Sequence, residues 1–513
     1  MIAAFAVWHV AKYEGPFEDS FITYRYARNA AGGLGVVYNP GERVEGCTSL
    51  AWTLILAAFA KLRFPIPETG TVLSLVSAGA LLLLTASLAW RSTDRRGWSF
   101  LVAPALLAAN GTFAYYAGTG METLFFSLLL LGAVALAASD RSHPSWLGLL
   151  LGLSAATRPE GAGHAAVILL TLATFPSTRR RAAVASAIFG ALLGALLLFR
   201  HHYYGDFLPN TYYAKATPGR ALWLRGLRFV EEQLTFWAGI VGVVAVGYLA
   251  ARGKSAADGL QRFRVLSATV CGAAYANTIL VGGDTFLFHR FLLPAFPLTS
   301  IALACVTRRL VDPASPARRR SLAAAVALVA SWSCGAGFLP RYSLLARGAD
   351  PFYELSRGIQ ETNEHYFIVG RWLHDHLPPT TVMAVNAAGI VPYVSELRTI
   401  DMLGLNDAHI AHRPISLGSG LLGHEKYDPD YVLDRAPDVI IAGLPILSSK
   451  RLHVQDLGAW YGRFAPFIPG DRVLLQNPRL GAYTLKVAKV SDSRFLVLLV
   501  KRGSDADIRL RKA

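Results

Sequence analysis

The acidic pair Glu18-Asp19 near the amino end of the chain has the residue types of a catalytic base with a helper. The pair follows a short apolar run, Ile2 to Val10, so both carboxylates lie at the outer end of a predicted membrane crossing. A carboxylate in that position could accept a proton from a reacting hydroxyl or supply half of a metal site. A solvated loop that caps the next helix is the alternative interpretation.

An aromatic and basic stretch follows the acidic pair and contains Tyr24, Arg25 and Arg28. Tyr24 and Arg28 share a face at helical spacing, and the stretch ends at the Gly32-Gly33 turn. The pattern predicts an amphipathic helix that lies on the membrane surface and contributes to substrate binding.

Further ionisable and aromatic residues lie at the ends of apolar runs, on the same predicted side as the acidic pair. A charge at the end of a span is costly unless it pairs or faces a watery cavity, so a functional role is the default interpretation. The alternatives are an ion pair that fixes helix packing, such as Arg158 with Glu122, and an ordinary interfacial belt of aromatic residues. The candidate substrate-binding residues are Glu122, Arg158, Glu160, Asn210, Tyr212, Lys215, Asp284, His289 and Arg290. Because arginine forks match phosphate oxygens and aromatic faces pack on sugar rings, this set suits a phosphate-linked lipid that carries a sugar.

The composition places these residues in a polytopic membrane protein. The chain has 513 residues, of which 53% are hydrophobic and 16% charged, and its mean hydropathy is +0.37. These values are too apolar for a soluble enzyme of this size, and they exclude a disordered chain. The net charge of +16 would be typical of a nucleic-acid binder, but the cations are clustered between apolar runs. We therefore interpret the charge as a topology signal and expect no nucleic-acid partner.

About eleven membrane crossings are predicted from the apolar runs, because a spanning helix needs about 20 such residues. Ile2 to Val10 is about half a span, which predicts that the first crossing is incomplete at the amino end. The ten further runs are Thr71 to Trp90, Trp98 to Tyr116, Thr123 to Ala138, Trp146 to Thr157, Ala162 to Phe175, Ala182 to Phe199, Phe229 to Ala250, Val265 to Val281, Phe291 to Val306 and Leu322 to Leu339.

Clusters of basic residues orient these runs, since such clusters favour the cytoplasmic side. The clusters are Arg91, Arg95 and Arg96; Arg179 to Arg181; Arg252, Lys254, Arg262 and Arg264; and Arg308, Arg309 and Arg318 to Arg320. All of them fall on one side if Thr48 to Leu62 is a juxtamembrane helix and not a span. The amino end is then inside and the carboxyl end outside.

The chain changes character near Arg341. Short β-type runs, Thr381 to Val385, Val439 to Ala442, Tyr483 to Val487 and Phe495 to Val500, alternate with polar stretches. We predict a transmembrane domain over residues 1–340, whose first outer loop is 13–47, and an extracytoplasmic α/β domain over residues 341–513. The four cysteines, Cys47, Cys271, Cys305 and Cys334, match neither a zinc spacing nor a disulfide framework.

The first outer loop resembles that of the integral-membrane GT-C glycosyltransferases. The resemblance is carried by the stretch from Glu18 to Asn29 and the stretch from Gly35 to Ser49, and it is greatest to the branch that includes the actinobacterial terminal arabinofuranosyltransferase of cell-wall arabinan. Similar family patterns recur at Gly120 to Thr123, Thr157 to Gly161, Tyr203 to Lys215, Gly282 to Pro294, Asp401 to Asp407 and Gly423 to Lys426.

The resemblance implies an all-α GT-C membrane domain and an inverting transfer from a polyprenyl-phosphate sugar donor, with an acidic residue of the first loop as the base. Family members often carry two aspartates there, whereas this chain has Glu18 before Asp19, so which of the two acts stays open. We expect Asp19 to be the base, helped by Glu18, and the donor phosphodiester to lie near Arg158, Lys215 or Arg290. A divalent cation held by the carboxylates also stays open, because no ligand cluster with diagnostic spacing is present.

The implied location is the bacterial inner membrane, with catalysis on the extracytoplasmic face. The implied acceptor is a cell-envelope glycan, lipid or protein, and the sugar could be a pentose such as arabinofuranose. Two other function classes stay open. One is a lipid-linked sugar flippase or transporter, for which symmetrical halves with broken helices would be expected. The other is a non-catalytic envelope scaffold whose charges pack helices.

Overall fold

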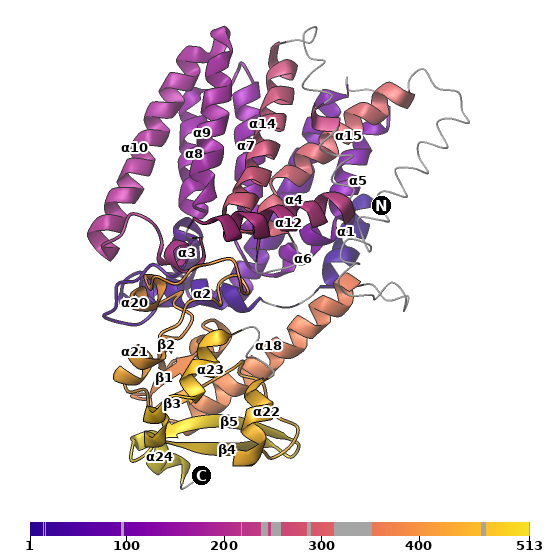
Figure 1. Ribbon diagram of the computed structural model, residues 1–513. Coiled ribbons are helices and arrows are strands. Elements are labelled where there is room, and N and C mark those ends of the chain that lie inside the picture. Colours follow the sequence, from indigo (N-terminus) through magenta and orange to yellow (C-terminus); the bar gives the residue numbers. More distant parts are fainter. Residues whose placement is uncertain are drawn as a thin grey trace.

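A computed structural model shows a helical bundle joined to a smaller domain that contains a five-stranded sheet (Figure 1). The structure describes residues 1–513 apart from 14, 16, 94–96, 217, 237–244, 248–257, 285–288, 312–350, 463–467 and 512–513. The predicted span Leu322 to Leu339 and several basic residues lie outside the described residues, namely Arg95, Arg96, Arg252, Lys254 and Arg318 to Arg320. Cys334 lies outside them as well.

Apolar sequence forms the bundle helices, as the hydropathy pattern predicts. They are α1 (Ile2–Ala11), α4 (Ile66–Ser92), α5 (Val102–Ala109), α6 (Gly111–Gly118), α7 (Thr123–Ala138), α8 (Pro144–Thr157), α9 (Glu160–Thr174), α10 (Arg179–Tyr204), α14 (Asp258–Leu280) and α15 (Ala295–Val311). Short 3₁₀ turns precede three of them: η1 (Ser99–Leu101), η2 (Pro176–Thr178) and η4 (Arg290–Leu292). Among the described residues, two helices are long and apolar enough to cross a membrane, or three if one bent pair forms a single span. The number of about eleven crossings therefore stays a prediction.

Two of the predicted spans differ from the structure. The run Trp98 to Tyr116 is bent by 59° between α5 and α6. Asn110 lies at the bend, where its side chain accepts a hydrogen bond from the backbone N–H of Phe113 and caps α6. The prediction of an apolar span beginning at Phe229 is wrong at its start, because that residue lies inside the charged, amphipathic helix α12 (Arg220–Phe236).

The first outer loop lies between the bundle and the sheet domain (Figure 1). It contains α2 (Glu18–Ala31) and leads into α3 (Leu50–Lys61), and the short helix α11 (Asn210–Lys215) approaches it from the bundle. The helix predicted after the acidic pair is confirmed, and it ends at Gly32. Most of its side chains are buried within the protein, so the helix does not present an open amphipathic face, and its position on the membrane stays a prediction. Phe21 of α2 and Trp52 of α3 belong to the same apolar cluster as residues of the sheet domain.

The sheet has the strand order β2-β1-β3-β5-β4. Its strands are β1 (Val382–Val385), β2 (Arg398–Asp401), β3 (Val439–Ile441), β4 (Tyr483–Ser491) and β5 (Arg494–Lys501). β1 pairs in parallel with β2 and β3, whereas β5 runs antiparallel to β3 and β4. Four strands match the predicted β-type runs. β2 was not predicted from the sequence, because it is short and begins with an exposed arginine.

Helices surround the sheet and link it to the bundle. The long helix α18 (Pro351–His376) runs from the bundle side towards the sheet (Figure 1). The shorter elements are α19 (Ile390–Ser395), α20 (Ala408–Ala411), α21 (Pro429–Asp434), η6 (Val454–Asp456), α22 (Leu457–Gly462), α23 (Pro469–Leu475), η7 (Pro478–Ala482) and α24 (Asp505–Leu510). The predicted mixed α/β character of this region is confirmed.

The guanidinium of Arg25 joins α2 to the sheet domain. It donates hydrogen bonds to the carbonyl oxygens of Tyr38 (2.9 Å), Pro392 (2.5 Å) and Leu397 (2.8 Å), and to Oδ1 of Asn39 (3.1 Å). Only 3% of the residue is exposed. The structure therefore places Arg25, a predicted substrate-binding residue, in the contact between the two domains.

Two further predicted binding residues of α2 also lie in this contact. Arg28 donates to Oε1 of Glu396 (2.8 Å) and to the carbonyl of Tyr393 (3.0 Å). Tyr24 is fully buried, and its ring lies edge-on to the rings of Phe21 and Tyr393. These contacts follow from the burial of α2, which the sequence did not reveal.

Replacing Arg25 with methionine should lower the stability of the whole protein. The change leaves buried oxygen acceptors without a donor, and we expect a loss on the order of 3 kcal/mol. Thermal unfolding of the purified protein in detergent measures it. Arg28→Met is the matched control, because Arg28 is more exposed and pairs with an exposed glutamate, so its loss should stay near ~1 kcal/mol. Equal losses for the two variants would contradict the role given to Arg25.

Candidate active site

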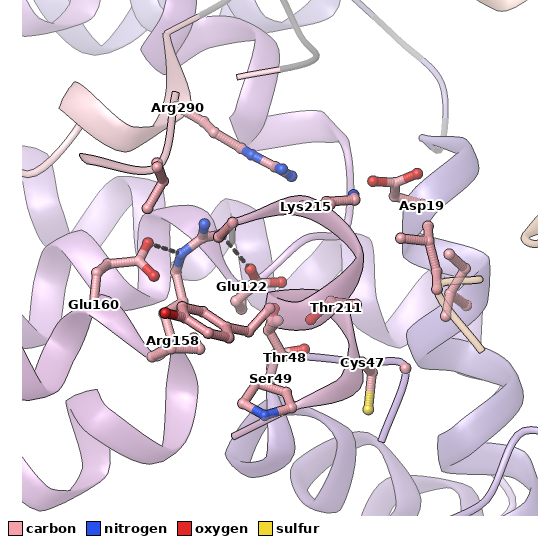
Figure 2. A pocket seen from close by; sticks show the side chains of 18 of the residues that line it. Asp19, Cys47, Thr48, Ser49, Glu122, Arg158, Glu160, Thr211, Lys215 and Arg290 are labelled. Carbon is pink, nitrogen blue, oxygen red and sulfur yellow. Dashed lines mark hydrogen bonds and ion pairs between the residues drawn. The ribbon is translucent and has the colours of Figure 1, made fainter. Parts of the chain in front are cut away.

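A cavity between the bundle and the first outer loop collects many of the predicted binding residues. Asp19, Glu122, Arg158, Glu160, Tyr212, Lys215 and Arg290 all line it, and we call it the bundle cavity. Figure 2 shows that the side chains of Asp19, Lys215 and Arg290 point into this space from different elements. They come from α2, α11 and η4, which lie far apart in the sequence. The fold thus brings charged side chains from distant parts of the sequence to one cavity.

Arg158 is held between two carboxylates in the wall of the bundle cavity (Figure 2). Its Nη1 lies 2.6 Å from Oε1 of Glu122, and its Nε lies 2.5 Å from Oε1 of Glu160. Glu122 stands at the start of α7 and Glu160 at the start of α9, while Arg158 follows α8. The cluster therefore ties three helices together. Because two carboxylates surround one guanidinium, Arg158 has little charge to offer a ligand phosphate.

Arg290 reaches the bundle cavity from η4. Its Nε lies 2.8 Å from Oδ2 of the buried Asp284, so the predicted group at residues 284–290 forms an ion pair. His289, also predicted as a binding residue, is buried next to it, with its ring 4.6 Å from that of Phe229. Neither Asp284 nor His289 is among the residues that line the bundle cavity. They support Arg290, which does line it.

Lys215 enters the cavity at the end of α11. Asn210, at the start of this helix, donates from Nδ2 to the carbonyl oxygens of Gly404 (2.8 Å) and Leu405 (2.9 Å). Asn210 thus anchors α11 to the sheet domain and fixes the backbone position of Lys215 at the other end of this helix. No carboxylate among the described residues forms an ion pair with Lys215, so its charge is available to an anionic ligand.

A second cavity, the outer cavity, lies between the start of α2 and the sheet domain. It is lined by Glu18 of α2, by Asn363 of α18, by Asn386 after β1 and by His424. Asp19 and Lys215 line both cavities, together with Ile22 and Leu405. Two ligands, one in each cavity, could therefore meet at a single carboxylate and a single ammonium group.

Glu18 and Asp19 have different surroundings. Glu18 turns towards the sheet domain, where its Oε1 accepts a hydrogen bond from the backbone N–H of Gly389 (2.6 Å). Burial, with a further contribution from the neighbouring Asp19 carboxylate, raises the pKa of Glu18 from 4.5 to about 8. Glu18 is therefore protonated at neutral pH and cannot accept a proton. Of the two residues, Asp19 is the candidate base.

The structure assembles no carboxylate-rich metal site from the part of the chain that it describes. Within those residues, no three His, Cys, Asp or Glu side chains come together as potential ligands. One oxygen of the Glu18 carboxyl is already occupied, because it accepts a hydrogen bond from the backbone N–H of Gly389.

Asn386 and Asn363 line the outer cavity but were not predicted as site residues from the sequence. Asn386 directly follows β1, and residues after parallel strands gather at one edge of a sheet, so its position was a usable signal. Asn363 lies on the amphipathic helix α18, where nothing in the spacing distinguishes it from other polar residues.

The protonation of Glu18 predicts how stability depends on pH. The unfolded chain releases the Glu18 proton near pH 4.5, whereas the folded protein keeps it until about pH 8. Between these values the wild type loses stability as the pH rises, and Glu18→Gln, which cannot ionise, avoids that loss. The difference in unfolding temperature, variant minus wild type, should therefore increase with pH up to about pH 8. Above pH 8 this difference should stay constant. A difference that is constant from acid to neutral pH would mean that Glu18 is already ionised.

Comparison with known proteins gives sequence relatives over part of the chain. The terminal β-(1→2)-arabinofuranosyltransferase of Mycobacterium tuberculosis is 32% identical over 254 residues, which is 45% of this chain and 40% of that protein. The protein of the same name from Corynebacterium glutamicum is 26% identical over 355 residues, or 57% of this chain and 48% of that protein. The chain therefore matches less than half the length of either relative. A family described as a domain of unknown function, DUF8728, matches residues 357–486, within the sheet domain.

Comparison with solved structures covers nearly the whole chain. ArnT from Cupriavidus metallidurans bound to undecaprenyl phosphate has a TM-score of 0.57 at 12% identity, over 98% of both chains. Its apo state gives a TM-score of 0.56 at 12% identity, over 97% of both chains. This likeness shows a shared fold, and the long apolar helices among the described residues support an integral membrane protein. The chain has the fold of ArnT and is similar in sequence to terminal arabinofuranosyltransferases, so the resemblance inferred from its motifs is confirmed.

Proposed function

We propose that this protein is a membrane glycosyltransferase that moves a sugar from a polyprenyl-phosphate donor to a hydroxyl group of a cell-envelope acceptor. The observation that carries the proposal is the meeting of two cavities at Asp19 and Lys215. A transfer reaction needs a donor site and an acceptor site that share one reacting point, and two cavities with shared lining residues support such an arrangement. The similarity to proteins named arabinofuranosyltransferases supports arabinofuranose as the sugar.

The donor lies in the bundle cavity, where its lipid tail enters between the helices. The undecaprenyl phosphate bound to ArnT, a protein of the same fold, supports this class of donor. Lys215 and Arg290 face the donor phosphate and neutralise the charge that grows on it as it leaves. Arg158 keeps a packing role, because Glu122 and Glu160 already compensate its charge.

The acceptor enters from the outer cavity with its hydroxyl next to Asp19. The hydroxyl oxygen bonds to the anomeric carbon while the bond from that carbon to the phosphate oxygen breaks. The proton of the hydroxyl passes to Asp19, and the polyprenyl phosphate leaves with the electron pair. In this proposal the hydroxyl attacks from the side opposite the leaving phosphate, so the configuration at the anomeric carbon is inverted. The protonated Glu18 holds the start of α2 against Gly389 and leaves the role of base to Asp19.

The orientation in the membrane follows from the charge pattern. The described basic residues Arg179 to Arg181 lie at the start of α10, at the end of that helix remote from the sheet domain (Figure 1). Basic clusters favour the cytoplasmic side, so the sheet domain and both cavities are extracytoplasmic, at the bacterial inner membrane.

The roles of the acidic pair give a direct test. The purified protein in detergent is supplied with polyprenyl-phosphate-linked radiolabelled arabinofuranose and a synthetic arabinofuranoside acceptor. Asp19→Asn should lower the transfer rate by about 10²- to 10⁴-fold, because general-base catalysis is lost. Glu18→Gln is the matched control and should stay within about threefold of the wild type at pH 7, since glutamine keeps the acceptor oxygen for Gly389.

Three outcomes would contradict the proposal. Full activity of Asp19→Asn would remove Asp19 from the role of base. Movement of intact labelled lipid across liposomes, without transfer, would indicate a flippase. A wild type that binds the glycan but neither transfers sugar nor moves lipid would indicate a scaffold.

A further inference from the structure

The strand order of the sheet domain places a ligand crevice at the ends of β1 and β3. β2 lies on one side of β1 and β3 on the other, so the chain reverses direction in the sheet order between β1 and β3. In open parallel sheets, ligands bind outside the carboxyl ends of the strands at such a reversal. Asn386 follows β1 and Leu444 follows β3, and both line the outer cavity. The crevice that the topology predicts is therefore the outer cavity.

The side chain of Asn386 is held in one orientation at this crevice. Its Nδ2 lies 3.0 Å from each carboxylate oxygen of Asp471 and donates to the carbonyl oxygen of Gly443 (2.9 Å). Asp471 is fixed in turn by the backbone N–H of Gly443 (2.7 Å). Burial raises the pKa of Asp471 to about 6, so its carboxylate is ionised at neutral pH. A buried carboxylate needs hydrogen-bond donors, which here are the Asn386 amide and the backbone N–H of Gly443. The amide nitrogen must face Asp471, and Oδ1 is left on the opposite side.

We infer that Asn386 is a specificity-determining residue of the acceptor subsite and that Asp471 is its positioning residue. Oδ1 of Asn386 accepts a hydrogen bond from an acceptor hydroxyl other than the one that attacks the sugar. Two observations support this role. Asn386 lines the same cavity as Asp19, and no described residue donates a hydrogen bond to its Oδ1. This inference rests on the proposed glycosyl transfer.

The test combines changes in the acceptor with changes in the protein. Wild-type protein in detergent is assayed with an octyl arabinofuranoside disaccharide and with its monodeoxy analogues, each lacking one hydroxyl that does not attack. The analogue that lacks the hydroxyl bound by Asn386 should have a KM about 5- to 10-fold higher than that of the full disaccharide, which is the effect of one lost hydrogen bond. Asn386→Ala should raise the KM of the full acceptor by a similar factor, with kcat and the donor KM within about twofold. With this variant, the deoxy analogue and the full acceptor should have the same KM.

Asp471→Asn tests the positioning role. The amide that replaces the carboxylate can still accept from the backbone N–H of Gly443, but its NH₂ group then presents a donor to Asn386 and turns the Asn386 amide around. The variant should therefore lose selectivity for the same hydroxyl while kcat is retained, a change that a merely structural role would not produce. Asn477→Ala is the matched control, because Asn477 belongs to the same domain and lines neither cavity.

A folding defect of Asn386→Ala would come from the buried carboxylate that it leaves without its amide partner. The paired variant Asn386→Ala with Asp471→Asn removes that charge as well, and unfolding temperatures identify the variants that are folded. An unchanged acceptor KM and an unchanged deoxy penalty in any folded Asn386 variant would overturn the inference.

Direct binding separates this inference from the proposed reaction. Calorimetric titration of the same octyl disaccharide needs no donor and no turnover. If the wild type transfers no sugar but binds the disaccharide, and the folded Asn386 variant binds about 5- to 10-fold more weakly, the proposed function fails and the subsite stands. Equal binding by the two proteins would overturn the subsite.

Discussion

The burial of α2 between the helical bundle and the sheet domain is the constraint on which the site depends. The guanidinium of Arg25 satisfies carbonyl groups of the outer loop and of the sheet domain at once, so the two parts of the chain share one hydrogen-bonded contact. Phe21 adds an apolar contact to the same region. Because Asp19 lies at the start of this helix, its position is set by both domains. Neither the bundle nor the sheet domain alone would hold a carboxylate between the two cavities.

The charges near the cavities have two different tasks. Arg158 is compensated by two glutamates at the point where three helices meet. Arg290 pairs with Asp284, but its side chain still points into the bundle cavity. Lys215 forms no ion pair with any residue that the structure describes, and it lies where the cavities join. This division of charge is the reason why the proposed function assigns the donor phosphate to the junction of the cavities and not to the Arg158 cluster.

Much of the architecture could be predicted from the sequence, because hydropathy reports burial directly. The run Thr123 to Ala138 became α7 with the same ends, and four of the five strands matched apolar runs.

The site could be predicted in part. Glu122 and Arg158 were recognisable as candidates because charges at the ends of apolar runs are rare, and their pairing was weighed as an alternative. The sequence could not show that Arg25 serves the fold, because its partners Pro392 and Leu397 are distant in the chain. The separation of Glu18 from Asp19 was equally hidden, since it depends on the backbone of Gly389.

The placement of the donor can be tested with a structure of the protein with bound polyprenyl phosphate, determined by electron cryomicroscopy in a lipid nanodisc. We expect the phosphate to lie in the bundle cavity, in contact with Lys215 and Arg290, with its free oxygen directed towards Asp19. We also expect Arg158 to keep its contacts with Glu122 and Glu160. A phosphate outside the bundle cavity, or one bound by Arg158 after those contacts have opened, would contradict this placement.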